Sequence, residues 1–232
     1  MKDIEYFLID PKELKQIRMY RLPIDAGSDI TCYPYDLHTV IKIFEITCNS
    51  PKDKLFLPHN KYGNNSYSFV NKVGINKDDL IICYTMPYIR GEKLNVYNFN
   101  ELSIETLLSF IKIFLKDTHT ISQNGIYTYD NFISNIILNR TGFHNIDPID
   151  FQIIDKDPTL IEKDNIQIFF TNFWEYLLNN NLRDFCTNHK LSKEFLYTDP
   201  ISFFTELTNT VSSTYNQEIT SIKQIKILTK KK

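Results

Sequence analysis

The chain has 232 residues, of which 42% are hydrophobic, enough for one large domain or two packed lobes with a sizeable core. Its formal net charge of −2 lacks the basic excess of a broad nucleic-acid-binding surface, so we expect no nucleic-acid partner. No stretch offers the ~18 uninterrupted apolar residues of a membrane span, and the charged N-terminus lacks a signal-peptide core. The four scattered cysteines form no CxxC pair. We therefore predict a cytoplasmic protein without membrane association.

Strands dominate the first hundred residues. We predict them at 18–24, 29–35, 38–46 and 80–89. The first two flank a turn centred on Gly27, and the last is nearly all apolar, as in a central strand. Pro87 is expected to turn the far end of this last strand into an extended connector. The polar stretch 47–79 is predicted to be irregular, with room for one short helix.

A helical pattern follows these strands. In the stretch 102–121, apolar residues recur every three to four positions, which predicts a helix buried along one face. Two short strands are predicted next, at 135–139 and 143–149, joined by a turn at Thr141–Gly142.

The rest of the sequence is predicted to be helical, with helices at 161–180, at 200–216 and near the C-terminus. The predicted fold class is therefore α+β, in which a β-rich N-terminal lobe (residues 1–88) precedes a helical C-terminal lobe (residues 89–232). We expect the sheet of the first lobe to be antiparallel.

Three polar side chains flank the predicted hairpin of the second lobe. Asn135 lies five residues after Asp130, and Asp147 lies twelve residues beyond Asn135. A hairpin between them would bring Asn135 near Asp147, and two such oxygen-bearing side chains can hold a hard divalent cation. Asp130, on the preceding loop, could orient a hydroxyl group or accept its proton. The simpler interpretation is an Asx-turn at Asp130 and Asn135.

A lysine and a glycine of the first lobe suggest an anion site. Lys42 lies in the middle of the otherwise apolar strand "VIKIF", so its side chain either reaches water or meets an anion. Gly27, in the preceding turn, would let the backbone approach a phosphate closely. The five histidines show no metal-ligand spacing, and we interpret them as structural or surface residues.

The order of these motifs resembles the protein-kinase-like fold, in the divergent form found in bacteria and phages. The matching stretches are "DAGSDITCYPY", "VIKIF", "TMPYIRG", "DNFISN" and "NIDPIDF", which correspond to the glycine hairpin, the lysine strand, the hinge, the catalytic loop and the metal loop. The resemblance covers roughly residues 15–180.

The resemblance implies a role for each candidate residue. Lys42 would pair with the α and β phosphates of ATP, and Gly27 would lie in the loop that covers them. Asp130 would be the catalytic aspartate, and Asn135 and Asp147 would hold Mg²⁺.

The resemblance also implies a nucleotide contact at the hinge and a brace for the catalytic loop. The backbone of Thr85, Met86 and Tyr88 would form hydrogen bonds with the edge of the adenine. Asp164 would brace the catalytic loop from the start of the central helix of the second lobe.

The sequence departs from the family pattern in several places. The phosphate loop has one glycine, Thr128 replaces a histidine, and Pro148 replaces the glycine after the metal aspartate. No glutamate lies between Glu45 and Glu92 to pair with the strand lysine, for which Asp53 is the candidate. The segment after the metal loop is short and lacks an Ala-Pro-Glu anchor.

The sequence therefore predicts an ATP- and Mg²⁺-dependent kinase, whose acceptor is Ser/Thr of a protein or the hydroxyl of a small molecule. The alternative is an inactive pseudokinase that serves as a nucleotide-binding or protein-interaction scaffold. A third interpretation keeps the fold but changes the transfer to adenylylation.

Overall fold

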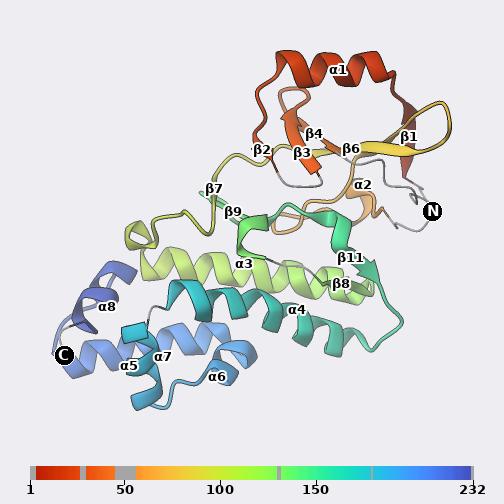
Figure 1. Ribbon diagram of the computed structural model, residues 1–232. Helices are drawn as coiled ribbons and strands as arrows, with labels where there is room; N and C mark the ends of the chain where they lie inside the picture. Colours follow the sequence, from red (N-terminus) through yellow and green to blue (C-terminus); the bar gives the residue numbers. More distant parts are fainter. Residues whose placement is uncertain (1–3, 27–29, 45–55, 130–131, 179, 231–232) are drawn as a thin grey trace.

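The computed structural model describes residues 4–26, 30–44, 56–129, 132–178 and 180–230. The protein is of the α+β class, in which an N-terminal mixed sheet is followed by a mostly helical region (Figure 1). Within the described residues, no helix is both long enough and apolar enough to cross a membrane.

The N-terminal sheet has six strands in the order β1-β5-β6-β4-β3-β2. The strands are β1 (Glu5–Leu8), β2 (Asp25–Ala26), β3 (Ile30–Pro34), β4 (Thr39–Phe44), β5 (Lys72–Ile75) and β6 (Ile81–Pro87). All neighbours are antiparallel except β1 and β5, which run parallel. The prediction of an antiparallel sheet is therefore wrong at this edge, where β1 joins a strand that comes much later in the chain.

Helix α1 (Pro11–Tyr20) corrects the predicted strand at 18–24, because Arg18 to Tyr20 form its last turn. The helix begins where Asp10 Oδ1 accepts the Lys12 N–H at 2.7 Å, with Pro11 in the first turn, where a missing N–H costs nothing. Ile17 is buried against the outer face of the sheet, on which α1 lies (Figure 1).

The second half of the chain is mainly helical. Its helices are α3 (Ile104–Gln123), α4 (Pro158–Asn172), α5 (Asn180–Asn188), α6 (Lys193–Thr198), α7 (Pro200–Tyr215) and α8 (Ile222–Leu228), and the short α2 (His59–Tyr62) precedes them. Helix α3 confirms its periodic pattern, and Ser103 caps its N-terminus with a side chain that accepts the Thr106 N–H. Phe114 of α3 stacks on Phe169 of α4 with ring centroids 3.7 Å apart, at the centre of the helical core. A π-helical turn, Phe173–Leu177, extends α4.

Two small sheets lie between the helices and the large sheet (Figure 1). They comprise β7 (Glu92–Lys93), β9 (Ile136–Asn139) and β10 (Gly142–Asn145) in one, and β8 (Ile126–Thr128) and β11 (Phe151–Ile153) in the other. The predicted hairpin is confirmed by the antiparallel pair β9–β10, but its turn lies one residue earlier than predicted, at Arg140 and Thr141, because Gly142 already pairs with Asn139 as the first residue of β10, with a positive φ of 135°. Its second strand ends at Asn145, earlier than predicted.

The segment before β5 joins the two halves of the protein. The Ser66 N–H donates to Asp117 Oδ2 at 3.0 Å, and the Tyr67 hydroxyl lies 2.8 Å from Thr118 Oγ1, so this segment is held on α3. The Ser68 N–H also donates to the Asn145 carbonyl at 3.0 Å. These buried contacts fix the large sheet above the hairpin β9–β10.

Candidate functional site

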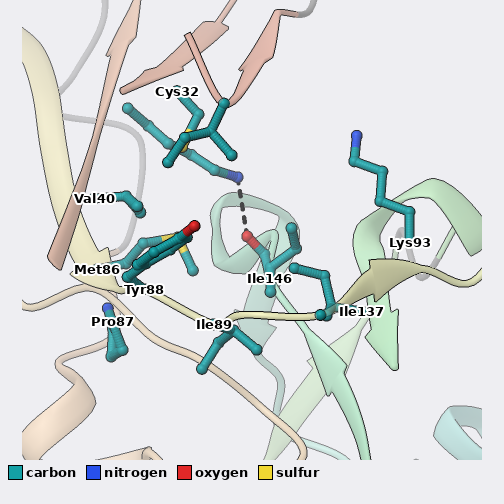
Figure 2. Close-up of a pocket in the computed structure, with 12 residues that line it drawn as sticks. Cys32, Val40, Met86, Pro87, Tyr88, Ile89, Lys93, Ile137 and Ile146 are labelled. Atoms are coloured by element: carbon teal, nitrogen blue, oxygen red, sulfur yellow. Dashed lines mark hydrogen bonds between the residues drawn. The ribbon is translucent and has the colours of Figure 1, made fainter. Parts of the chain in front are cut away.

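A cavity of about 240 Å³ lies between the large sheet and the hairpin β9–β10 (Figure 2). Val40 and Met86 line it from the sheet, and Ile137 and Ile146 line it from the hairpin side. The full lining is Ile24, Cys32, Val40, Lys42, Met86, Pro87, Tyr88, Ile89, Gly91, Lys93, Ile137 and Ile146. These walls are mostly apolar, so the cavity can accept a flat aromatic ring whose faces pack against them.

Lys42 reaches from the sheet to the other wall of this cavity. Its Nζ donates to the Ile146 carbonyl oxygen at 2.9 Å, the bond dashed in Figure 2, and lies 3.1 Å from Asp147 Oδ1. The Lys42 side chain is only 11% exposed. A lysine in a buried strand costs free energy unless it is paired, and here it is paired with a carboxylate 105 residues away.

The hairpin brings Asn135 and Asp147 together, as predicted. Asn135 Nδ2 donates to Asp147 Oδ2 at 3.3 Å, and the Ile146 N–H donates to the Asn135 carbonyl at 2.9 Å. The Asp147 N–H donates to Asn145 Oδ1 at 3.1 Å, which orients the backbone that carries the carboxylate. Their proximity is confirmed, whereas their binding of a cation stays a prediction.

The side chains of Asp147 and Asn135 are suitable ligands for Mg²⁺, but two side chains do not complete its coordination shell. A carboxylate and an amide oxygen are hard oxygen ligands of the kind that Mg²⁺ prefers. Within the described ranges, no group of three or more His, Cys, Asp or Glu side chains could hold a metal ion by itself. A cation at Asp147 and Asn135 would therefore take its remaining ligands from water and from phosphate oxygens, as Mg²⁺ commonly does.

Tyr84 is a residue of this site that the sequence analysis missed. It is fully buried opposite Lys42 in the β4–β6 pairing, and its hydroxyl lies 3.5 Å from Asp147 Oδ1. Burial, followed by the nearby Asp147 charge, raises the pKa of Tyr84 well above its usual range, so the hydroxyl stays protonated and can donate. Strand alternation places Tyr84 and Met86 on one face of β6, a signal that the sequence does contain.

The end of β6 and the residue after it form part of the cavity wall. Met86, Pro87 and Tyr88 line the cavity, whereas Thr85 does not. The Thr85 carbonyl accepts the Asn71 N–H at 2.7 Å, and alternation turns its side chain to the other face of the sheet. Thr85 therefore lies outside the cavity lining, and a contact of its backbone with a nucleotide stays a prediction.

A different backbone donor is available at the hinge. The Tyr88 N–H already donates to the His38 carbonyl at 2.7 Å. The next amide, that of Ile89, has no acceptor among the described residues. Ile89 also lines the cavity, so its N–H can bind a ligand there.

Three candidate residues, Gly27, Asp53 and Asp130, lie outside the described residues. Strand β8, which precedes Asp130, is described, and the buried side-chain amide of Asn165 forms hydrogen bonds with it. Asn165 Oδ1 accepts the Thr128 N–H at 2.8 Å and the Thr128 hydroxyl at 2.9 Å, while its Nδ2 donates to the Ile126 carbonyl at 2.9 Å.

This contact corrects the prediction for Asp164. Asp164 is 37% exposed and pairs with Lys156 at 2.5 Å, whereas the neighbouring Asn165 holds Ile126 and Thr128 of β8, the strand that precedes the predicted catalytic loop. The resemblance implied Asp164, but adjacent residues of a helix point about 100° apart, and here Asn165 is the one that faces β8. A buried amide can serve here because it offers an acceptor and a donor at once.

No protein-family model matches this chain, and no curated protein matches its sequence. The arrangement itself defines an α+β protein with an apolar cavity, a buried lysine that lines it, and a carboxylate–amide pair that this lysine contacts. Its function is inferred from this arrangement.

Proposed function

We propose that the protein is an ATP- and Mg²⁺-dependent phosphotransferase of the protein-kinase-like fold, with an N-terminal lobe of residues 1–88 and a C-terminal lobe of residues 89–232. One observation carries the proposal. Lys42 of the sheet and Asn135 of the hairpin region meet the two oxygens of the Asp147 carboxylate, at 3.1 and 3.3 Å, beside an apolar cavity.

The chemistry of these side chains suits phosphoryl transfer. The Lys42 ammonium would offset the charge of the nucleotide phosphates, while Asp147 and Asn135 would hold Mg²⁺. The bound Mg²⁺ would neutralise charge that develops on the transferred phosphoryl group. The base would lie between Val40 and Ile137, with the Ile89 N–H as a donor at its edge.

Asp130 completes the proposed mechanism. It lies two residues beyond Thr128, whose N–H donates to the buried Asn165 side chain. We assign Asp130 the orientation of the acceptor hydroxyl and the acceptance of its proton.

The structure favours a small-molecule acceptor over an extended peptide. Only residues 148–157 separate Asp147 from α4, and most of them form a 3₁₀ turn (Pro148–Asp150) and strand β11. β11 is itself paired with β8. Few residues therefore remain to form a binding platform for a peptide. We propose a cytoplasmic enzyme that acts on the hydroxyl group of a small molecule.

One observation favours the alternative of an inactive scaffold. Within the described residues, Asp147 is the only carboxylate that pairs with Lys42. In this arrangement the Asp147 carboxylate is occupied by the Lys42 ammonium. If a separate acid paired with Lys42, Asp147 would be free to bind a cation. If this ion pair persists with nucleotide bound, the protein would bind ATP without transferring phosphate.

Nucleotide binding and transfer can be measured separately. Mg-ATP should raise the melting temperature, since a ligand at a hundredfold excess over its Kd stabilises the native state by about 2.7 kcal/mol. Release of ADP should then be measured with a panel of small hydroxyl compounds as acceptors. Lys42→Met, Asp147→Asn and Asp130→Asn should each abolish ADP release, whereas Lys72→Met, which removes an exposed lysine of β5, should not.

The outcomes distinguish the candidate functions. A melting-temperature rise without ADP release would favour the scaffold. The absence of both would reject a nucleotide site at this cavity. Release of pyrophosphate in place of ADP would indicate adenylylation.

A further inference from the structure

A second cavity, of about 320 Å³, lies among the last helices of the chain. Residues at the ends of α7 and α8 and along α5 line it, and Figure 1 shows these helices near the C-terminus. The lining residues are Asn181, Asp184, Phe185, Asn188, His189, Tyr215, Thr229 and Lys230. None of these described residues lines the cavity beside Lys42, so the two cavities are separate. A cavity of this volume suits a small molecule.

Three rings form one wall of this second cavity. The His189 ring stacks on Phe185 with centroids 4.1 Å apart, and the Tyr215 ring lies 6.4 Å from Phe185 at an interplanar angle of 26°. Phe185 is buried in the helical core, so the wall is anchored there. An aromatic wall of this kind favours a ligand with a flat apolar group that can pack against it.

Two opposite charges line the same cavity without pairing. Asp184 lies on α5 and Lys230 follows α8, and among the described residues neither side chain forms an ion pair. A ligand that carries an ammonium group and a carboxylate can pair with both side chains at once. Charge complementarity of this kind selects the ligand that carries both groups over one that carries a single charge.

The lining also retains hydrogen-bond acceptors. The Thr229 hydroxyl donates to the Ile225 carbonyl at 2.9 Å, so the oxygen keeps its lone pairs, and the residue is buried. His189 Nδ1 lies 2.9 Å from the Phe185 carbonyl oxygen. A carbonyl oxygen only accepts, so Nδ1 donates and the neutral ring keeps Nε2 as an acceptor. Together with the Asp184 carboxylate, these acceptors suit an ammonium group, which has three donors to satisfy.

We propose that this cavity binds a free amino acid with an aromatic side chain. Asp184 pairs with the ammonium group of the ligand and Lys230 pairs with its carboxylate, while the side-chain ring packs against the wall that contains Phe185 and Tyr215. The proposal goes beyond the phosphotransferase function and does not depend on it, because the two cavities share no lining residue.

The test measures binding of L-phenylalanine to the full chain by isothermal titration calorimetry at neutral pH. Three analogues each lack one group of the ligand: phenethylamine lacks the carboxylate, phenylpropanoate lacks the ammonium group, and L-alanine lacks the ring. Each analogue should bind to wild type about tenfold more weakly than L-phenylalanine, since each loses one contact. Equal affinity for L-phenylalanine and for any of the three analogues would overturn the proposal.

Two variants assign the charged groups of the ligand to their partners. Asp184→Asn should bind L-phenylalanine no more tightly than phenylpropanoate, and Lys230→Gln should bind it no more tightly than phenethylamine. The matched controls are Glu206→Gln on α7 and Lys223→Gln on α8, which remove exposed charges outside the lining and should bind L-phenylalanine as wild type does.

Two further outcomes would overturn the amino-acid site. One is an equal loss of affinity in the control variants, and the other is the absence of L-phenylalanine binding to wild type at millimolar concentration. A melting-temperature rise with Mg-ATP in the same preparation would show that the protein is folded and that its nucleotide site stands apart from this result.

Discussion

The Tyr84 hydroxyl lies 3.5 Å from Asp147 Oδ1, the same oxygen that accepts from the Lys42 ammonium. Burial raises the pKa of Tyr84, so this hydroxyl is a donor throughout the neutral range. Tyr84→Phe removes the donor and keeps the ring, which packs against Phe44 and Phe56. We expect the free energy of unfolding to fall by about 1 kcal/mol and the affinity for Mg-ATP to fall several-fold, because the Asp147 carboxylate is less well oriented.

Tyr67→Phe is the matched control for this prediction. Tyr67 is also fully buried, its hydroxyl contacts Thr118 at 2.8 Å, and neither residue lines the cavity. It should lose a similar free energy of unfolding in urea titrations without any change in Mg-ATP affinity. Equal Mg-ATP affinities of Tyr84→Phe and wild type would show that Lys42 alone orients Asp147.

Asn165→Ala should be among the most destabilising single substitutions in the helical half. It leaves the Thr128 N–H and the Ile126 carbonyl buried without their partner, at about 1–3 kcal/mol for each group. We expect a loss of about 2–4 kcal/mol in the free energy of unfolding, measured by urea denaturation. ADP release should fall as well, since the strand that leads to Asp130 loses its support.

The neighbouring Asp164→Ala is the comparison for Asn165→Ala. Its ion pair with Lys156 is more than a third exposed, so its loss should cost less than about 1 kcal/mol. Asn165→Asp tests the chemistry of the brace, because a carboxylate keeps the acceptor for Thr128 but loses the donor to Ile126. A larger loss in Asp164→Ala than in Asn165→Ala would restore the original assignment of the brace.

Sequence patterns predicted the elements whose signals are local. The period of α3, the hairpin before Asn145 and the β-branched run of β4 all specify structure within a short window, and all three elements form, the hairpin with its turn one residue earlier than predicted. The proximity of Asn135 and Asp147 follows from the same logic, because a short hairpin can only fold back on itself.

The features that the sequence did not reveal depend on tertiary contacts. Strand β1 pairs in parallel with β5, about 67 residues later in the chain, and nothing in either strand specifies that partner. Tyr84 acquires its place beside Asp147 only when β6 and the hairpin meet. The choice between Asp164 and Asn165 is likewise made by packing against β8, not by helix periodicity.

Gly91→Ala should displace the hinge from the hairpin. The added Cβ would meet Ile137 Cγ2 at 2.5 Å and the Leu138 carbonyl oxygen at 2.6 Å, and a backbone oxygen cannot move aside without shifting β9. We expect a loss of about 1–3 kcal/mol in the free energy of unfolding, together with weaker nucleotide binding, because Ile137 lines the cavity.

Glu92→Ala is the control for the hinge, since Glu92 is exposed and adjacent to Gly91. It should leave both the unfolding midpoint and the nucleotide affinity close to wild type. A Gly91→Ala protein with wild-type stability would mean that the hinge and β9 do not approach as closely as the structure places them.

Acidification should destabilise the protein through His59. Burial lowers the pKa of His59 below its ordinary value of about 6.5, and its Nδ1 accepts the Phe69 N–H at 3.1 Å, which only an unprotonated nitrogen can do. Burial lowers the pKa of His144 in the same direction. Because the unfolded chain binds these protons more readily, the stabilisation is complete above pH 6.5 and is lost as the pH falls toward the folded-state pKa values.

Urea midpoints measured between pH 7.5 and 5 check this prediction. Carboxylates also make the midpoint depend on pH, but they contribute equally in wild type and in the histidine variants, so the variants are compared with wild type. His59→Gln should reduce the slope of the midpoint against pH below 6.5, because the unfolded state of this variant no longer takes up a proton at position 59. His38→Gln is the control, since the His38 side chain is exposed, and its slope should match wild type. A wild-type slope in His59→Gln would place the proton uptake elsewhere, and His144→Gln would then be expected to flatten it.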